Sequence, residues 1–344
     1  MTRRVERLMR VFAVLCAVAL VSSVATGQGR GGRGGRGQGR NQLPPPKDVV
    51  APAIPGVVAA GTRIELVAFP VAMPEGPIGL PDGSGIVFTE RGVDHITKVD
   101  ASGHTSMFVE KSNGSNGLAW DSRGRLISVQ RAQGNERVGV LYPPASVATL
   151  ADSFEGKPLN ALNDLVVSLK DGVYFTAVQA VYFLPPEGQV KKVIDTIKNP
   201  NGVQLSPDEK ALYANDKDGE YLLAFDVLPD GSLTNRRNFG KYKSVTIPGH
   251  KDPRLAEDNG ADGLAIDSDG RVYAATNAGV EVFSPRGEHL GVIPIGVWGG
   301  EQNMLSKPSN LTFAGPDKRI LYTVGSSAVY RVQTLAQGFK GRGK

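Results

Sequence analysis

Short apolar runs alternate along this chain with turns that are rich in Asp and Gly. The stretch DGLAIDSDGRVYAAT, which begins at Asp262, shows the pattern: an apolar run, a turn around Asp269 and Gly270, and a second apolar run. Runs of this length, bounded by Gly and Asp, are typical of β-strands joined by hairpins rather than of helices. The pattern therefore predicts an all-β protein.

This strand–turn–strand unit occurs six times, and successive units begin 41, 47, 38, 61 and 48 residues apart. Self-similarity at a period of about 40 to 50 residues is typical of the four-stranded blades of a propeller. We therefore predict a six-bladed β-propeller over residues 61–335. Each unit opens on a polar residue with a side-chain oxygen, which we call its opener; the openers are Glu75, Asn116, Asn163, Asn201, Asp262 and Asn310.

The two ends of the predicted ring explain how it closes. The last unit supplies only three strands, whereas the apolar segment 63–69, ahead of the first opener, has no hairpin partner of its own. We expect this N-terminal strand to complete the sixth blade, because a closed ring leaves only short, protected sheet edges. A β-sandwich and an open repeat array are the alternative architectures, and a count of six units favours the ring.

The first 27 residues have the pattern of a secretory signal peptide. Arg3, Arg4, Arg7 and Arg10 precede an apolar run over residues 11–21, which small residues follow. Such a run is too short to span a membrane comfortably, and it is typical of a segment removed on export. The only cysteine, Cys16, lies within it. We therefore predict a secreted or periplasmic protein with no membrane span and no disulfide after cleavage.

Composition separates the ends of the chain from its middle. Residues 28–60 are Gly/Arg-rich and then Pro-rich, which predicts a flexible linker, and residues 336–344 form a basic tail. Residues 1–48 hold nine Lys or Arg against two Asp or Glu, a net charge of +7, while the whole chain carries +5. The remainder therefore carries −2, and we expect no nucleic-acid partner for the folded domain. The Arg-rich segment lacks interleaved aromatic residues, which favours a spacer over a nucleic-acid-binding arm.

The openers are the candidate site residues. The innermost strand of each blade lines the central channel of a propeller, so residues that open these strands should meet at one mouth of the channel. Two carboxylates and several amide oxygens facing one point favour a bound divalent cation, Ca²⁺ first, then Mg²⁺ or Mn²⁺. None of the four histidines opens a unit, which disfavours a His/Cys zinc site. The alternative for any single Asn-Gly opener is ordinary turn chemistry.

The ordered set of motifs resembles the gluconolactonase and regucalcin (senescence marker protein) family of calcium-dependent six-bladed propellers. This resemblance covers residues 62–333. The chain also resembles diisopropyl fluorophosphatase, more distantly. It implies that Glu75, Asn163, Asn201 and Asp262 bind the cation, that Asn163 contacts metal or substrate depending on the member, and that Asp262 also transfers the proton. The matching stretches are EGPIGLPDG, NGLAWDSRGRL, NDLVVSLKDGVYFT, PNGVQLSPDEKALY, DGLAIDSDGRVYAATNAGVEVFSPRGE and NLTFAGPDKRILY.

The resemblance implies a secreted, divalent-metal-dependent hydrolase that opens a sugar-type lactone. A cation would polarise the lactone carbonyl, and a carboxylate beside it could pass a proton from water to the ring oxygen. We assign Asn116, Asp164 and Asn310 to substrate binding or to the channel lining. Two alternatives stay open: a non-catalytic propeller that binds a carbohydrate or a protein, and a phosphotriesterase-like hydrolase that uses the same site.

The chain departs from the family pattern beside the third opener. Sugar-lactonase members commonly have an arginine two positions before the Asn-Asp pair, where it contacts substrate; here that position is Ala161. The third unit also runs from Thr176 into Val181 without the usual long loop, which suggests a more open mouth. A contact to a hydroxylated or anionic substrate is therefore missing or comes from elsewhere. Because a shared site does not fix the substrate, gluconolactone itself is the least secure expectation.

Overall fold

Strands make up nearly all of the regular structure, as the alternating pattern predicts. The computed structural model describes residues 49–243, 259–295 and 307–342. The predicted signal peptide, the predicted linker up to residue 48 and the last two residues of the predicted tail lie outside these ranges. Within them the only helix is the 3₁₀ turn Pro144–Ser146. No helix of the described residues is long and apolar enough to cross a membrane.

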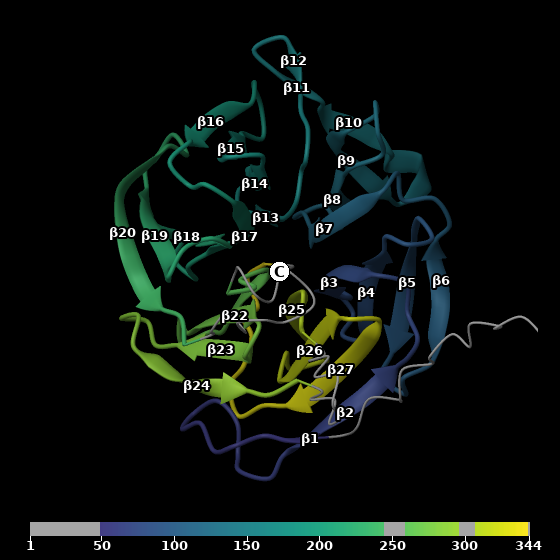
Figure 1. Ribbon diagram of the computed structural model, residues 1–344. Coiled ribbons are helices and arrows are strands. Elements are labelled where there is room, and N and C mark those ends of the chain that lie inside the picture. Colours follow the sequence, from purple (N-terminus) through teal and green to yellow (C-terminus); the bar gives the residue numbers. More distant parts are fainter. Residues whose placement is uncertain (1–48, 244–258, 296–306, 343–344) are drawn as a thin grey trace, which may run out of the picture. The chain divides into compact units, whose positions relative to one another are not determined.

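Six antiparallel sheets stand around a common centre, and the chain passes through them in order (Figure 1). Each of the first five sheets has four consecutive strands, with its first strand innermost. Blades 1 to 3 comprise β3 (Pro74–Gly79), β4 (Gly85–Glu90), β5 (His95–Asp100), β6 (Thr105–Val109); β7 (Ser115–Trp120), β8 (Leu126–Gln130), β9 (Arg137–Tyr142), β10 (Ala148–Ala151); and β13 (Leu165–Val167), β14 (Val173–Ala177), β15 (Ala180–Leu184), β16 (Lys191–Ile194).

The remaining strands complete the ring, and a small hairpin lies between blades 2 and 3. The hairpin pairs β11 (Ser153–Phe154) with β12 (Lys157–Pro158). Blades 4 to 6 comprise β17 (Pro200–Leu205), β18 (Ala211–Asp216), β19 (Tyr221–Val227), β20 (Leu233–Lys241); β21 (Leu264–Ile266), β22 (Val272–Thr276), β23 (Gly279–Phe283), β24 (His289–Ile293); and β25 (Asn310–Ala314), β26 (Ile320–Gly325), β27 (Ala328–Gln333), β2 (Arg63–Ala68), β1 (Val49–Val50).

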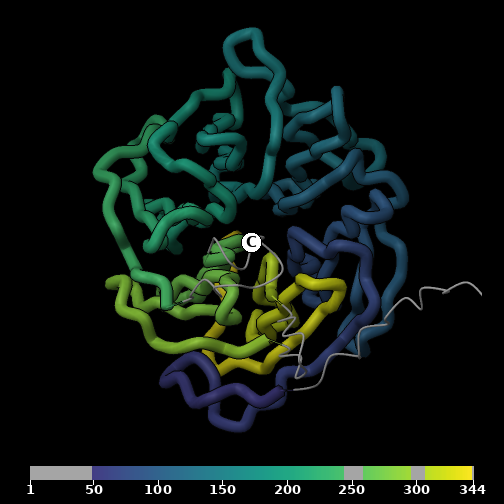
Figure 2. The backbone as a smooth tube through the Cα atoms, viewed as in Figure 1, coloured from purple at the N-terminus to yellow at the C-terminus, as the bar shows by residue number. Residues whose placement is uncertain are grey.

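The N-terminal strand closes the ring, as the sequence predicts. Strand β2 pairs antiparallel with β27, and Ile64 lies opposite Val332. Figure 2 shows the purple N-terminal segment running beside the yellow C-terminal blade. The sixth blade thus combines strands from both ends of the described chain, which ties the first unit to the last and closes the ring.

Residues 49–60, placed in the linker on composition, instead pack on the propeller. Strand β1 adds a fifth strand outside β2. Ile54, Val57 and Val58 are buried in the same apolar cluster as Tyr273 and Val280 of the fifth blade. Three buried aliphatic side chains outweigh the Pro-rich composition, since burying each contributes about 1.5 to 3 kcal/mol. The ordered fold therefore begins at least twelve residues before the predicted boundary at 61.

The core lies between neighbouring blades rather than at the centre. Between blades 1 and 2, for example, Ile78 and Val87 pack against Leu118 and Trp120. Each sheet therefore buries both of its faces against its neighbours, which explains why the inner strands are apolar on both sides. The centre is left to polar residues, and these form the candidate site.

Candidate active site

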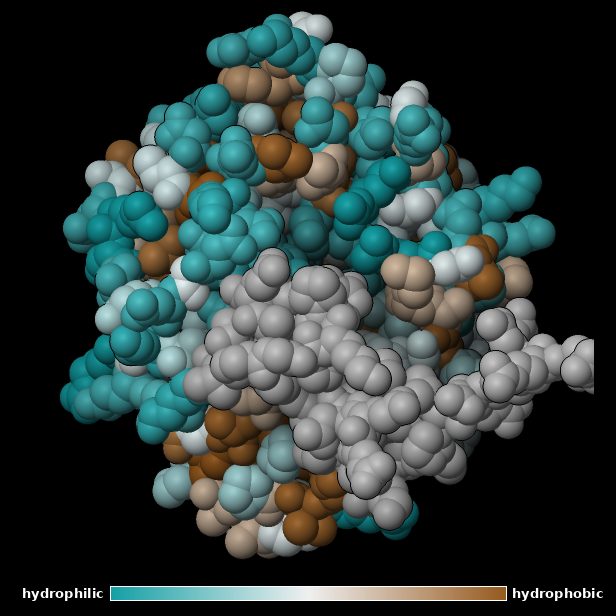
Figure 3. Space-filling view, viewed as in Figure 1, coloured by the Kyte–Doolittle hydropathy of each residue, from teal (hydrophilic) through white to brown (hydrophobic). Residues whose placement is uncertain are grey.

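All six openers lie at the start of the innermost strands. Glu75, Asn116, Asn201 and Asn310 are within β3, β7, β17 and β25, while Asn163 and Asp262 come just before β13 and β21. Asn163 is partly buried and the others are buried. Because the inner strands all run in the same direction along the channel, they all begin at the same end of it, which we call the opener mouth. On the face in Figure 3, hydrophilic side chains of the described residues border the hollow at the middle of the ring along its upper side.

Contacts across blade boundaries bring the openers together. The side-chain amide of Asn116 donates to Oδ1 of Asn163 at 2.9 Å, and the backbone N–H of Gly117 donates to the carbonyl oxygen of Asn163 at 3.1 Å. The Glu75 carboxyl is in electrostatic contact with Asp262 and with Asp164. Residues from blades 1, 2, 3 and 5, almost 200 positions apart in sequence, therefore face one another.

The glycine after an opener is a packing requirement, not only turn chemistry. A Cβ added at Gly202 would lie 2.2 Å from the carbonyl oxygen of Asp262, and one at Gly263 would lie 2.0 Å from Oδ1 of Asn310. Neither distance is compatible with a side chain. Each glycine therefore gives room to the opener of the following blade, as Gly76 does for Asn116, whereas Gly117 gives room to Asp164, the residue after the opener Asn163.

Polar residues near the end of the second strands hold the openers' backbone. The Thr89 hydroxyl is 3.1 Å from the carbonyl oxygen of Asn116, Thr176 donates to that of Asn201 at 2.6 Å, and the Asn215 side chain donates to that of Asp262. Each hydrogen bond joins one blade to the next. Sequence reasoning missed these residues, although a buried polar side chain in an otherwise apolar second strand was the available signal.

Burial raises the pKa values of the two carboxyl openers, and neighbouring carboxylates add to the effect. Loss of solvent is the main cause at Glu75, and the nearby Asp262 carboxylate adds to it, so the pKa of Glu75 rises to about 8. Burial also raises the pKa of Asp262, where Lys217 and then Lys307 act against it. The Lys307 Nζ lies 3.9 Å from Oδ2 of Asp262. Such paired, shifted carboxyls in a channel are typical of functional sites.

The donor set fits a hard divalent cation. Oδ1 of Asn116 and Oδ1 of Asn201 are buried without a hydrogen-bond partner among the described residues. These two amide oxygens, with the carboxylates of Glu75 and Asp262, are the kind of ligands that Ca²⁺ accepts. Within the described ranges no three His, Cys, Asp or Glu are grouped to hold a metal, so the set must mix amides with carboxylates. Asn163, the other predicted ligand, uses its Oδ1 to accept the Asn116 amide.

The remaining two predicted site residues contact neighbouring blades. Oδ1 of Asn310 accepts the backbone N–H of Leu311 at 2.9 Å and lies against Gly263. Oδ1 of Asp164 accepts the backbone N–H of Leu165 at 2.9 Å and lies against Gly117. Both side chains therefore line the junction between two blades, which agrees with a place in the channel wall.

The raised pKa of Glu75 predicts that a cation bound at these donors would affect stability in a pH-dependent way. An unfolded glutamate titrates near its ordinary value of 4.5 and the folded one near 8, so between these values the metal-free fold binds more protons than the unfolded chain. Its free energy of unfolding therefore falls as the pH rises through this window. A cation would replace the proton, so we expect the rise in Tm between EDTA and excess Ca²⁺ to be larger at pH 8 than at pH 5.5.

Differential scanning fluorimetry at the two pH values measures this difference. Glu75→Gln removes one of the two carboxyls with a raised pKa and should make the calcium-induced rise smaller and less dependent on pH. A rise of the same size at pH 5.5 and pH 8 in the unaltered protein would contradict the role of Glu75.

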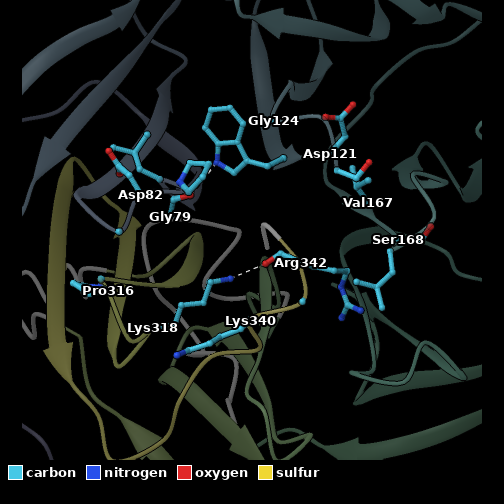
Figure 4. A pocket seen from close by; sticks show the side chains of 18 residues that line it. Gly79, Asp82, Asp121, Gly124, Val167, Ser168, Pro316, Lys318, Lys340 and Arg342 are labelled. Carbon is cyan, nitrogen blue, oxygen red and sulfur yellow. Dashed lines mark hydrogen bonds between the residues drawn. The ribbon is translucent and has the colours of Figure 1, made fainter.

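At the opposite end of the channel, the segment after β27 crosses from blade to blade. The Phe339 N–H donates to the carbonyl oxygen of Ile266 in blade 5, and Lys318 Nζ donates to the carbonyl oxygen of Arg342 at 2.6 Å. The buried Arg342 guanidinium donates to the carbonyl oxygen of Leu205 in blade 4 at 2.6 Å. A cavity of about 570 Å³ remains beside it, and Figure 4 shows Lys318 reaching towards Arg342 there.

Residues 336–342, which the composition placed in a basic tail, therefore pack against the ends of the inner strands. Ala336 is buried, and Arg342 also bonds Glu209 at 3.0 Å, which compensates its charge. These contacts cover the inner-strand ends away from the openers. The candidate site, defined by the openers, lies at the other mouth of the channel.

Fold and site together define a six-bladed β-propeller whose channel mouth carries a buried ring of oxygen donors. The sequence profile of the SMP-30/Gluconolactonase/LRE-like region matches residues 73–327, so the chain belongs to this family. It is similar to the gluconolactonase of Zymomonas mobilis, with 27% identity over 326 residues that cover 84% of this chain and 86% of the relative. Both the fold and the family predicted from the sequence are therefore confirmed.

Two solved structures share the fold at lower identity. A gluconolactonase from Xanthomonas campestris superposes with a TM-score of 0.68 and 22% identity, over 84% of this chain and 95% of the other. Regucalcin from Agrobacterium tumefaciens, described as a calcium-binding protein, superposes with a TM-score of 0.59 and 15% identity, over 80% and 94%. At these identities the likeness bears on the fold alone.

Proposed function

We propose that this protein is a divalent-metal-dependent lactonase that hydrolyses a sugar-type lactone at the opener mouth. The observation that carries the proposal is the meeting of Glu75 and Asp262, both buried and with raised pKa values, beside amide oxygens that lack partners. Membership in the gluconolactonase family and similarity to a gluconolactonase over most of the chain support it.

Glu75, Asn201 and Asp262 would hold the cation, and Asn116 or Asn163 would supply a further amide oxygen. Calcium is our first choice because all the donors are oxygens and a regucalcin of the same fold is described as calcium-binding. When bound, the cation would polarise the lactone carbonyl and stabilise negative charge on its oxygen.

Asp262 would move the proton. Its carboxylate accepts a proton from water as the water oxygen bonds to the lactone carbonyl carbon. The bond from that carbon to the ring oxygen then breaks, and Asp262 returns the proton to this oxygen, which gives the open hydroxy acid. The raised pKa suits a base that must also act as an acid, and Lys307, at 3.9 Å, lies beside Oδ2.

We also propose that the protein is exported. The basic, apolar and small-residue regions of residues 1–27 support a cleaved signal peptide, after which the propeller would act in the periplasm or outside the cell.

A pH-indicator assay tests the activity directly. We expect the purified protein to release acid from D-glucono-1,5-lactone and related aldonolactones in Ca²⁺, and EDTA to remove at least nine-tenths of the rate because the carbonyl loses its electrophile. Paraoxon serves as a phosphotriester comparison. Hydrolysis of no lactone by protein that binds Ca²⁺ would overturn the proposal and favour a non-catalytic propeller.

A further inference from the structure

Three positively charged side chains occupy equivalent places at the opener mouth, on blades 1, 2 and 4. Arg91, Arg131 and Lys217 each come directly after the second strand of their blade, β4, β8 and β18. Their backbone N–H groups donate to the carbonyl oxygens of Met73 at 3.3 Å, of Gly114 at 3.1 Å and of Asn199 at 3.1 Å. Each of these acceptors lies two positions before an opener. Because the three residues occupy the same position in their blades, their side chains lie at the rim of the same mouth.

Among the described residues, none lies within bonding distance of the Arg91, Arg131 or Lys217 side chains as a hydrogen-bond or ion-pair partner. The part-buried Arg125 of blade 2, by contrast, pairs with Asp121. Arg131 and Lys217 are nevertheless partly buried. Withdrawing a charge from water without a partner is unfavourable. Burial and the neighbouring Arg91 lower the pKa of Arg131.

Among the described residues that act electrostatically on Glu75 and Asp262, the charges do not balance once a divalent metal ion is bound. Arg91 and Arg131 act electrostatically on Glu75 and Asp262, so they share their surroundings. The carboxylates of Glu75, Asp164 and Asp262 supply three negative charges, of which a divalent cation compensates two. Arg91, Arg131 and Lys217 then exceed the single negative charge that remains, and Lys307 beside Asp262 adds to the excess. The loaded mouth would attract an anion.

We propose that the site takes lactones that carry an anionic group, a carboxylate or a phosphate, and that Arg91, Arg131 and Lys217 receive it. This inference rests on the proposed lactonase function. The three residues would replace the substrate contact that an arginine makes in family members at the position of Ala161. Guanidinium groups suit this role because they bind carboxylate and phosphate oxygens through two parallel hydrogen bonds. The neighbouring blades, rather than blade 3 itself, therefore determine the substrate class.

The test compares the hydrolysis of three probes by the purified protein in saturating Ca²⁺. These are neutral D-glucono-1,5-lactone, its 6-phosphate, and the carboxylate-bearing D-glucaro-1,4-lactone. We expect kcat/KM to be at least about tenfold higher for one or both charged probes, and this preference to fall as salt rises from 20 to 300 mM because salt screens the attraction. The two charged probes distinguish a phosphate from a carboxylate site.

Matched variants locate the effect. Arg131→Gln and Arg123→Gln remove the same charge from blade 2, but Arg123 is in the exposed turn at the other end of the blade, 3.8 Å from Asp121. We expect Arg131→Gln to lower the charged-to-neutral ratio of kcat/KM about tenfold through KM, and Arg123→Gln to leave the ratio unchanged. Arg131→Lys should restore part of it, since Lys keeps the charge but loses the planar fork.

Failure of this inference and failure of the lactonase proposal give different results. Equal kcat/KM for all three probes, with hydrolysis that EDTA abolishes, would overturn the inference and leave the lactonase function. If no probe is hydrolysed, the Tm of the calcium-loaded protein is measured with 6-phosphogluconate and with the uncharged alditol D-glucitol. A larger rise with the phosphate, lost in Arg131→Gln, would support the anion site without the activity, and equal rises would overturn it.

Discussion

Asp262→Asn is expected to lower kcat for lactone hydrolysis about a thousandfold, the usual range for loss of a general base. The substitution keeps the size of the side chain and one oxygen that can face a cation, but it removes the group that accepts the proton. Asp262 is 7% exposed and its pKa is raised by burial, so water in the mouth is not expected to replace it easily. The backbone of residue 262 keeps its bond from Asn215.

The measurement is kcat in saturating Ca²⁺, together with calcium affinity by isothermal titration calorimetry. Asp269→Asn is the matched control, because Asp269 is an exposed turn carboxylate of the same blade that pairs with Arg271 at 2.9 Å. It should keep nearly full activity. If Asp262→Asn binds Ca²⁺ and retains a rate within threefold of the unaltered protein, another group transfers the proton.

Glu75 is expected to behave differently from Asp262. Glu75→Gln removes a charged ligand but no proposed proton acceptor, so we attribute its loss of rate to weaker calcium binding, which higher Ca²⁺ should largely restore. Asp262→Asn should stay slow at any Ca²⁺ concentration. Restoration of both variants by Ca²⁺, or of neither, would contradict the separate roles of the two carboxyls.

The repeat could be predicted from the sequence because each blade uses the same local pattern of strands and turns. Apolar runs, Asp-Gly turns and an oxygen-bearing opener recur in every unit, and the segment 63–69 lacked a partner, so six blades and their closure followed. The ends were misjudged for a physical reason. Composition separates Pro-rich or basic stretches from a core, yet Ile54 and Arg342 are fixed by contacts with residues more than 130 positions away.

The site could be predicted only as far as residue type and repeat position reveal it. The meeting of the openers followed from their place in the repeat. The roles of Thr89, Thr176 and Asn215 did not, because they depend on how close the next blade comes. The positively charged residues after the second strands could not be predicted from the sequence either. An Arg or Lys after a strand is common, and it becomes significant only where three such residues face one mouth.

The close approach of the blades gives the second large expected effect. Gly202→Ala should lower the free energy of unfolding by about 3 kcal/mol or more, the upper range for overpacking. The new Cβ would lie 2.2 Å from the backbone oxygen of Asp262 and 3.0 Å from the Asn215 side chain. A backbone oxygen cannot rotate away as a long side chain can, so blade 5 must move outward and take Asp262 with it. We therefore expect calcium affinity and lactone hydrolysis to fall together with stability.

Gly124→Ala provides the control, because it differs from Gly202→Ala in the cause of strain. Gly124 is in a turn with a φ of 72° and has nothing within 4 Å of an added Cβ. Its cost should be about 1 to 2 kcal/mol from the left-handed backbone alone, with the site undisturbed. Urea unfolding gives the stabilities, and calorimetry gives the calcium affinities. A Gly202→Ala protein as stable as Gly124→Ala, with unchanged calcium affinity, would show that the blades can separate without moving Asp262, and the Asn-Gly and Asp-Gly openers would then be turn chemistry after all.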